Sequence, residues 1–460
     1  MKHHQFHVIK DPVHGVMQFS HQEDQWIKPF INHPYLQRLR HIKQNGLADA
    51  VFPGAVYSRF NHALGCCYVG SQIANKIGLI DEEKQLVIIA CLLHDIGHGP
   101  FSHAFEDLFT HKCIRHEEWT PYFLRTFTSE AFLTTYNTLN PDFPLSADKM
   151  LCIQKMIMHE YTDNKLLSDI VSSQIDADRF DYLLRDSHFC GVKYGEFDLR
   201  WMLHCLTFVE TDGGLRLGVT HKGVGAVEHY LMARCLMIRN IYHHKKKQAV
   251  EYLLIQFMTK LAEHMPTTDF LAQYRDSPLG QLLVNANVFN HHIRENKPTR
   301  AEISTFLEKN FHLYERLCDY HVLVMIQELA QLTIEHDIIK LAQRIFHRHM
   351  PALITLPAEH IEAVRILVES YKKAQAEYLS TWQVAIINTP QSFYNEHHDP
   401  IWVVGSRGDK QKISDLSHII RALSDRHEPS CVLLMDKELA LTIHGHQFLD
   451  EIRELLSSNR

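Results

Sequence analysis

The chain has no Cys-x-x-C pattern among its ten cysteines, although Cys66 and Cys67 are adjacent. This absence argues against a zinc ribbon. Ten cysteines in 460 residues without such spacing are typical of reduced, buried thiols rather than of a disulfide framework.

Long apolar segments and an excess of positive charge are also missing. The start, MKHHQFHVIKDPVHG, has no apolar core like that of a signal peptide, and the run LVIIACLL is too short to span a bilayer. We therefore expect a cytoplasmic protein that does not bind membranes. A net charge of -7 and a pI near 6.6 make nucleic acid an improbable partner, whereas small anionic ligands remain open. Histidine is abundant instead, at 35 residues.

The patterning predicts a mainly α fold in three parts. Residues 1–25 alternate apolar and polar side chains around breaks at Asp11, Pro12 and Gly15, which indicates a short N-terminal β arm. Residues 26–375 carry apolar side chains at helical spacing and are expected to form an all-α body. Residues 376–460 contain the short apolar runs QVAIIN, IWVVG and CVLLMD and one helix, DLSHIIRALSD, which predicts a small C-terminal α+β region.

The segment HDIGHGPFSH stands at the end of an apolar helix, EKQLVIIACLL. Glycines and a proline follow, so His94 and Asp95 should lie at the C-terminal end of that helix. Neighbouring residues on a helix point about 100° apart, so both can reach one metal only near such an end. The dipeptide alone fits a surface capping aspartate equally well. Two further helices, however, offer His62 in SRFNHALG and Asp178 in QIDADRFDYLLRD.

These motifs, with DPVHG, LQRLRHIKQNG and RHEEW, follow one another between about residues 8 and 245. In this order they resemble the HD-domain phosphohydrolases, and more narrowly the deoxynucleoside triphosphate (dNTP) triphosphohydrolases. The resemblance implies an HD-domain helical body whose metal site lies within residues 59–186, with His62, His94, Asp95 and Asp178 as ligands. Two imidazoles and two carboxylates suit iron, manganese, nickel, cobalt or zinc, with magnesium as a further candidate.

Other histidines receive catalytic roles. His103 lies one helical turn from Glu106, a pair suited to general acid catalysis, and we assign His103 to protonate the leaving 5′-oxygen. The family commonly has aspartate where this chain has Glu106. By resemblance, His98 and His116 contact the phosphates.

The substrate-binding residues also come from the resemblance. Asp178, Tyr182 and Asp186 are spaced to share one helix face, whereas Asp181 and Arg185 are expected to form an ordinary helix salt bridge on another face. The resemblance implies contacts with phosphate for Arg179, with phosphate and sugar for Tyr182, with the 3′-hydroxyl for Gln44 and Asp186, and with the 2′ position for Tyr242. Arg59, three residues before His62, is a candidate because a cation must face the triphosphate.

Some positions depart from the family pattern. Asn45 replaces an apolar residue that faces the sugar, so selectivity against ribonucleotides is an open question. At the family's guanine-nucleotide effector site Gln37 and Arg40 are present, but His7 and Asn32 replace a lysine and an aspartate, and GTP activation is expected to be lost or altered. The basic run YHHKKKQ is interpreted either as a solvated helix face or as a phosphate contact at a subunit junction.

Three functional hypotheses follow. The first is hydrolysis of a dNTP to deoxynucleoside and triphosphate, by attack of a metal-activated hydroxide on the α-phosphorus. The second is a phosphomonoesterase or phosphodiesterase acting on another nucleotide, and the third is a nucleotide-binding or nucleic-acid-binding module with incidental hydrolysis. Arg59, Arg179 and Tyr182 favour a polyphosphate substrate. The resemblance also implies a homo-oligomer and a nucleotide effector.

Overall fold

The computed structural model describes residues 7–389, 393–424 and 430–457, so residues 1–6 of the predicted arm and parts of the predicted tail lie outside it. The arm is confirmed as an antiparallel hairpin of β1 (His7–Asp11) and β2 (Gly15–Phe19), in which Ile9 lies opposite Met17. Asp11 closes the turn, because its Oδ1 accepts the backbone N–H groups of Val13 and His14 at 2.9 Å.

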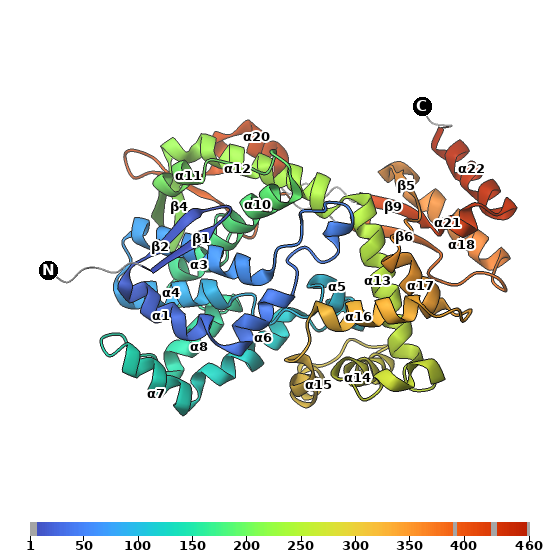
Figure 1. Cartoon of the computed structure of the whole chain (residues 1–460). Helices are drawn as coiled ribbons and strands as arrows, with labels where there is room; N and C mark the ends of the chain where they lie inside the picture. Colours follow the sequence, from blue (N-terminus) through green and yellow to red (C-terminus); the bar gives the residue numbers. More distant parts are fainter. Residues whose placement is uncertain (1–6, 390–392, 425–429, 458–460) are drawn as a thin grey trace.

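Helices make up most of the body, as predicted (Figure 1). Its first part contains α1 (His21–Ile31), α2 (Pro34–Arg38), α3 (Arg59–Ile77), α4 (Asp81–Leu93), α5 (His103–Glu106), α6 (His116–Leu124), α7 (Glu130–Leu139), α8 (Ala147–Ile157), α9 (Lys165–Val171) and α10 (Ala177–Cys190). The apolar run of α4 is buried against α3, α8 and α9, and α10 packs against α3. These contacts bring the ends of three helices together around His94.

The second part of the body begins on the same side of the molecule as the hairpin and then extends away from it (Figure 1). It contains α11 (Leu199–Cys205), α12 (Val224–Met237), α13 (Lys245–His264), α14 (Pro278–His292), α15 (Arg300–Tyr314), α16 (Asp319–Ala330) and α17 (Asp337–Phe346). Between α12 and α13 one wide helical turn spans Ile238–Tyr242. The buried side chains of both parts form one continuous hydrophobic core.

The all-α prediction for residues 26–375 is wrong at two places. A hairpin of β3 (Leu206–Thr211) and β4 (Gly214–Thr220) interrupts the helices, and β5 (Ala352–Leu356) precedes the predicted boundary at residue 376. The turn sequence TDGG between alternating apolar residues is a hairpin signal that could have identified β3 and β4.

The C-terminal region contains the predicted strands, but they enter two different sheets. β7 (Trp402–Val404) pairs parallel with β4 and antiparallel with β8 (Lys410–Lys412), giving the order β3-β4-β7-β8. β6 (Val384–Thr389) pairs with β9 (Ser430–Met435), which is the central strand of the sheet β5-β9-β6. The helices of this region are α18 (Ile361–Ala374), α19 (Ile413–Leu416), α20 (His418–Leu423), α21 (Lys437–Ala440) and α22 (Ile443–Ser457).

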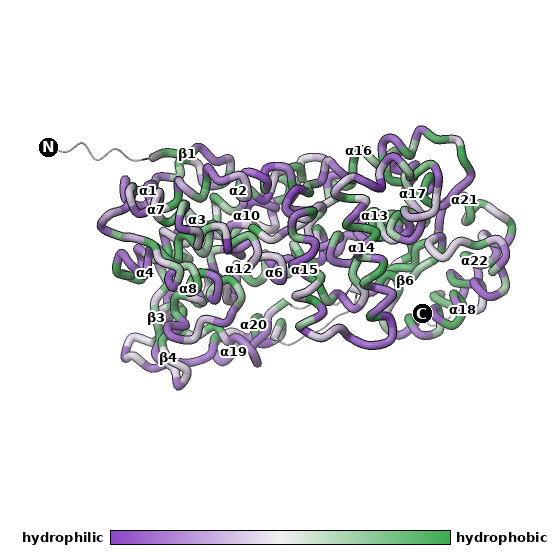
Figure 2. Tube along the Cα trace, turned by 90° about the horizontal axis from the view of Figure 1, so that it is seen from below, coloured by the Kyte–Doolittle hydropathy of each residue, from purple (hydrophilic) through white to green (hydrophobic). Residues whose placement is uncertain are grey.

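The sheet β5-β9-β6 has a small hydrophobic core of its own, to which α18 and α22 contribute. This core lies at the opposite end of an elongated molecule from the N-terminal hairpin (Figures 1 and 2). The second core therefore begins near Ala352, because β5 is needed to complete its sheet.

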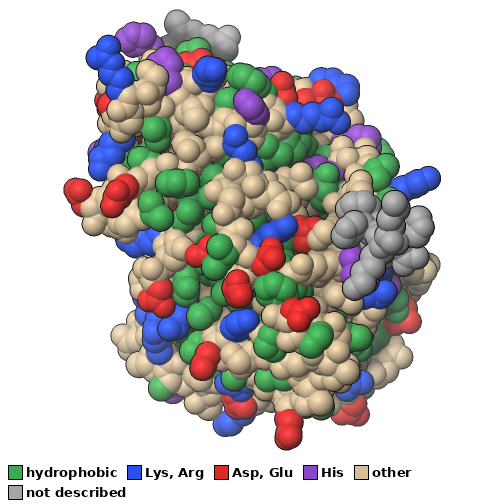
Figure 3. Space-filling view, turned by 90° about the vertical axis from the view of Figure 1, so that its left-hand side faces the viewer, with side chains coloured by type: hydrophobic (Ala, Val, Ile, Leu, Met, Phe, Trp, Pro, Cys, Tyr) green, Lys and Arg blue, Asp and Glu red, His purple; other side chains and the backbone are tan. Residues whose placement is uncertain are grey.

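The surface of the molecule carries side chains of both charges. On the side of the molecule where the N-terminal hairpin lies, Lys and Arg are interspersed with Asp and Glu (Figure 3). The ten cysteines are thiols that form no disulfide bond in the described part of the chain, six of them buried and four partly exposed. In the part of the chain that the structure describes, no helix is both long and apolar enough to cross a membrane.

Candidate active site

Four side chains from three helices converge on one point in the first part of the body. His62 lies in the first turn of α3, His94 and Asp95 directly follow α4, and Asp178 lies in the first turn of α10. His62 Nε2 lies 3.2 Å from His94 Nε2 and 3.0 Å from Asp178 Oδ1, and His94 Nε2 lies 3.5 Å from Asp95 Oδ1. The structure thus brings together all four residues that the sequence proposed as ligands.

The opposite ring nitrogens of both histidines are held by hydrogen bonds. His62 Nδ1 lies 2.7 Å from Asp181 Oδ2, and His94 Nδ1 lies 2.8 Å from the carbonyl oxygen of Cys91. Since these partners only accept hydrogen bonds, each Nδ1 carries the proton and each Nε2 lone pair faces the centre. This is the orientation that metal-binding histidines need.

The electrostatics of the centre also favour a cation. Burial opposes the charged form, but the hydrogen bonds to Asp178 and Asp181 raise the pKa of His62 to about 9. Burial also lowers the pKa of His94, but the charges of Asp95 and Asp178 outweigh burial and raise this pKa to about 10. Two imidazolium N–H groups cannot point at each other across 3.2 Å without repulsion. One divalent cation among the four donors would neutralise the charge of the carboxylates without placing two N–H groups against each other. These residues therefore fit a metal.

Asp181 has a larger role than the predicted helix salt bridge. It does pair with Arg185 at 2.8 Å, but it is buried and also accepts hydrogen bonds from His62 and, at 2.6 Å, from His14 Nε2. Arg185 in turn binds Asp11 at 2.8 Å. The predicted salt bridge is present, and it is buried because α3 and the N-terminal hairpin cover this face of α10. The DPVHG segment supplies both Asp11 and His14, and thereby supports His62.

Gly65, one turn after His62, explains how this network fits against α3. A Cβ atom at position 65 would lie 1.9 Å from Asp181 Oδ1 and 2.3 Å from an Arg185 guanidinium nitrogen. Only glycine therefore allows the buried carboxylate to approach α3 closely enough to reach His62.

Arg59 holds the other carboxylate of the centre. Its Nη1 donates to Asp95 Oδ2 at 2.5 Å and its Nε donates to Ser102 Oγ at 2.8 Å. Burial raises the pKa of the Asp95 carboxyl, but Arg59 and His94 outweigh it and hold that pKa well below its usual range. Arg59 therefore positions a candidate ligand, in addition to any contact that it makes with phosphate.

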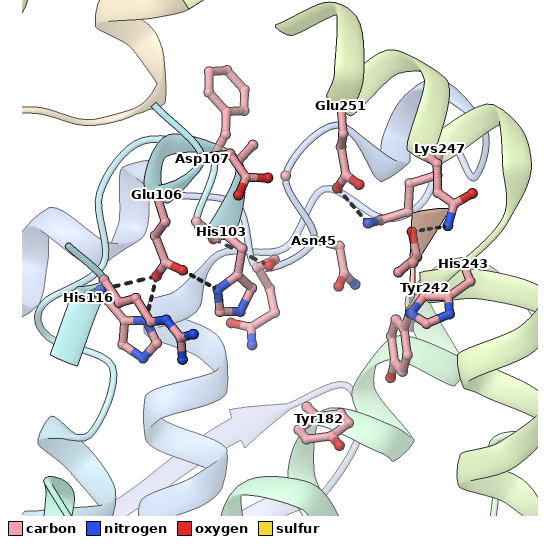
Figure 4. Close-up of a pocket in the computed structure, with 18 of the residues that line it drawn as sticks. Asn45, His103, Glu106, Asp107, His116, Tyr182, Tyr242, His243, Lys247 and Glu251 are labelled. Atoms are coloured by element: carbon pink, nitrogen blue, oxygen red, sulfur yellow. Dashed lines mark hydrogen bonds and ion pairs between the residues drawn. The ribbon is translucent and has the colours of Figure 1, made fainter. Parts of the chain in front are cut away.

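A second cluster consists of His98, His103, Glu106 and His116, each of which offers one side-chain nitrogen or oxygen atom within 4.8 Å of those of the others. Glu106 joins two of the rings: its Oε2 lies 3.2 Å from His103 Nδ1 and its Oε1 lies 2.7 Å from His116 Nδ1 (Figure 4). Glu106 also accepts the backbone N–H of His116. The longer glutamate thus bonds the predicted partner, His103, and a second ring that the sequence did not link to it.

His98 links the two clusters. Its ring stacks on His116 with centroids 3.6 Å apart, and its Nδ1 lies 3.2 Å from Asp95 Oδ1. Burial, followed by the charges of Arg59 and His116, lowers the pKa of His98 well below its usual value, so the ring is neutral. Its Nε2 is buried with no hydrogen-bond partner among the described residues. This atom is available to a ligand.

Two adjoining cavities, of about 700 and 260 Å³, are lined by the remaining predicted residues except Arg179. The smaller is lined by His94, Asp95, His98 and Asp178. Residues that line both cavities are Gln44, Arg59, His103, His116, Glu117 and Tyr182. A ligand can therefore extend from the four-residue centre into the larger cavity.

Asp186 organises the middle of the larger cavity. It accepts hydrogen bonds from Tyr57 at 2.5 Å, from Tyr242 at 2.8 Å and from the side-chain amide of Asn45. Burial raises its pKa, while the hydrogen bonds from Tyr57 and Tyr242 act in the opposite direction. Asn45, the departure from the family pattern, is thus tied to Asp186, and Tyr57 is a contact that the sequence did not suggest.

The arginines are distributed differently from the prediction. Arg179 donates to Asp176 Oδ2 at 2.6 Å and is absent from the described linings of both cavities. Arg234 of α12 lines the larger cavity, and its buried Nε finds no acceptor in the residues that the structure describes. A lone arginine within the apolar sequence YLMARCLMI was a signal that could have identified it.

One part of the run YHHKKKQ is exposed to solvent and another part lines the larger cavity. Lys245 and Lys246 are exposed, as on a solvated helix face. Lys247 and Gln248 are buried and line the larger cavity beside His243.

In the proposed effector site, Arg40 Nε donates to Gln37 Oε1 at 2.7 Å and Asn32 caps the C-terminus of α1. The side chain of His7 lies outside the described part.

Comparison with known proteins agrees with this geometry. Residues 59–184 match the HD domain family model, a range that contains all four residues of the centre. Over 98% of its length the chain is 29% identical to the uncharacterized protein YwfO of Bacillus subtilis, 96% of which is covered. It is also 29% identical, over 57% of its length, to human deoxynucleoside triphosphate triphosphohydrolase SAMHD1 and spans 45% of that protein.

Solved structures show the same relationship. A phosphohydrolase from Bacteroides thetaiotaomicron superposes with a TM-score of 0.72 at 25% identity, covering 94% of this chain and 100% of that one. A hypothetical protein from Aquifex aeolicus gives a TM-score of 0.68 at 26% identity, covering 97% and 100%. The chain therefore contains an HD domain and is related to phosphohydrolases.

Proposed function

We propose that this HD-domain protein is a metal-dependent phosphohydrolase that converts a dNTP to deoxynucleoside and inorganic triphosphate. The observation that carries the proposal is the four-residue centre opening into a cavity of about 700 Å³ that a nucleotide could enter. The similarity to a protein named as a dNTP triphosphohydrolase supports this reaction over other phosphate ester hydrolyses.

His62, His94, Asp95 and Asp178 would hold the metal. When bound, a divalent cation there supplies a Lewis acid that polarises phosphate and lowers the pKa of water. The mixed nitrogen and oxygen donors suit iron, manganese, nickel, cobalt or zinc, and less specifically magnesium. Asp181 and the Cys91 carbonyl keep the two rings oriented before any ligand arrives.

The second cluster would perform the proton transfer. The His103 side chain is 69% exposed and its Nδ1 is held by Glu106, so its Nε2 is free to approach a ligand. The carboxylate supports the protonated ring, as a general acid requires. Water adds to the α-phosphorus, keeping one proton on the triphosphate product and losing the other to solvent, and the bond from phosphorus to the 5′-oxygen breaks. His103 gives its Nε2 proton to that oxygen and is then reprotonated from solvent.

The cavity wall supplies the other contacts. Arg234, and the ring of His116 when it is protonated, can donate to the polyphosphate, whose negative charge must be offset before water can attack. Asp186 and Gln44 would bind the 3′-hydroxyl, and Tyr242 would limit space at the 2′ position. Arg179 would reach phosphate only by leaving Asp176.

Product analysis tests the proposal. Protein reconstituted with each metal in turn is incubated with the four dNTPs, the four NTPs and a phosphodiester, with and without GTP, and the products are resolved by chromatography. Deoxynucleoside with intact triphosphate is expected. Monophosphate with pyrophosphate, or turnover of the diester alone, would contradict this reaction while keeping the metal centre. A homo-oligomer and a nucleotide effector stay predictions of the resemblance, and a cytoplasmic location stays a prediction from the sequence composition.

A further inference from the structure

The end of the larger cavity away from the histidine cluster has a different chemical character. Figure 4 shows His103 and His116 on one side of the cavity and His243, Lys247 and Glu251 on the other. A nucleotide whose phosphates reach the histidines would place its base between these latter side chains. We call His243, Lys247, Gln248 and Glu251 the far-end group.

The charges of the far-end group balance one another. Lys247 is only 9% exposed, and its ammonium donates to Glu251 Oε1 at 2.5 Å. Burial, followed by the charge of Lys247, lowers the pKa of His243 to about 4, so its ring is neutral near pH 7. A neutralised end of this kind suits an uncharged polar group better than a phosphate.

Two atoms of the far-end group are left without partners. Gln248, 5% exposed, donates through Nε2 to Thr389 Oγ1 at 2.8 Å, but its buried Oε1 accepts no hydrogen bond from the described residues. His243 Nδ1 is likewise buried and unpaired within the described ranges. Buried polar atoms are rarely left unpaired, so these two indicate a polar ligand.

Glu251 is also open to the cavity. Its Oε1 lies 3.6 Å from the position that a Cβ atom would take at residue 46, which is glycine with φ +55°. The QNG loop that carries Gln44 and Asn45 therefore passes beside this carboxylate without a side chain in front of it. The loop links the sugar-side contacts to the far-end group.

We propose that the far-end group reads the edge of the base and favours guanine. Guanine is the one DNA base that presents two adjacent donors, N1–H and the 2-amino group, beside an acceptor, O6. The Glu251 carboxylate can accept from both donors while the Lys247 ammonium donates to O6, and ionised partners make such bonds strong. A site that pairs these groups discriminates against bases that leave them unpaired. The inference rests on the proposed function, because it assumes a nucleotide in this cavity.

Binding, measured apart from turnover, tests the inference. Chelator-treated wild-type protein is titrated calorimetrically with dGTP, dATP, dCTP, dTTP and dITP, whose base lacks the 2-amino group. We expect dGTP to bind most tightly and dITP about 10-fold more weakly. Glu251→Gln should weaken dGTP binding by about 10-fold to 100-fold and change dTTP binding little.

Two further variants separate recognition from folding. Glu263→Gln removes the exposed partner of Lys260 on the same helix, α13, and should leave every affinity unchanged. The charge swap Lys247→Glu with Glu251→Lys keeps an ion pair, and with it the thermal midpoint, but should lose the preference for guanine.

The inference is overturned if wild-type protein binds the four dNTPs equally, or binds none of them. It is also overturned if Glu251→Gln keeps the ratio of dGTP to dTTP affinity. Selective binding of dGTP with release of monophosphate would instead support the far-end group and contradict the proposed reaction, so the two ideas fail separately.

Discussion

Replacing Asp181 with asparagine tests whether the metal centre depends on a residue that is not a ligand. The carboxylate accepts buried hydrogen bonds from His62 and Arg185 and a partly buried one from His14. Asparagine keeps the shape but removes the charge that fixes the His62 tautomer. Loss of such a supporting partner typically lowers metal affinity by about 10-fold to 100-fold.

The same change should also cost stability. Removing one member of a buried ion pair costs about 3–5 kcal/mol when the remaining charge has no other partner. Arg185 keeps its bonds to Asp11 at 2.8 and 3.3 Å, so we expect a loss of free energy of unfolding at or below the lower end of that range, about 3 kcal/mol.

Metal retention against graded chelator concentrations, read by elemental analysis, measures the affinity, and denaturant unfolding measures the stability. Asp169→Asn is the matched control, because Asp169 is also buried and binds Arg216 through both oxygens but makes no contact with the centre. It should lose stability and keep its metal affinity. Unchanged metal affinity in Asp181→Asn, or an equal loss in the control, would refute the reasoning.

Three other changes probe the centre and its surroundings. His94→Ala should abolish bound metal and hydrolysis together, and metal content that persists in this variant would show that the ligands are elsewhere. His103→Ala should keep the metal but slow turnover by about 10² to 10⁴ fold, the usual cost of losing a general acid; an unchanged rate would remove this assignment. Gly65→Ala places a methyl group 1.9 Å from Asp181 Oδ1, so the thermal midpoint and the metal affinity should both fall, and a wild-type profile would mean that α3 and α10 separate without cost.

Much of the fold could be predicted because its signals are local. The hairpin at Asp11 and Gly15, the helix that ends at His94 and the short C-terminal strands follow from turn residues and apolar periodicity within about 20 residues. The β3–β4 hairpin was missed although its TDGG turn is equally local, since helical periodicity on both sides favoured one uninterrupted body. The parallel pairing of β7 with β4 joins residues about 180 positions apart, for which no local signal exists.

The site shows the same division. Spacing put His94 and Asp95 at a helix end and placed Tyr182 and Asp186 on one face of α10, and the structure has both arrangements. Spacing also indicated that Asp181 and Arg185 pair, but not that α3 and the hairpin would bury them. Exposure depends on which elements cover a helix face, and periodicity within one helix does not contain that information.

What the sequence by itself determined is the set of chemical groups and the helices that carry them. His62, His94, Asp95 and Asp178 could be named because a family resemblance and local spacing both mark them. The tertiary structure alone decided the partners of these groups. Asp181 accepts a hydrogen bond from His62, and Glu106 bonds two histidine rings. Arg234 instead of Arg179 lines the larger cavity, where Lys247 also pairs with Glu251. The physical reason is that hydrogen bonds and charge pairing act over a few ångströms in space, and folding brings together groups that are far apart along the chain.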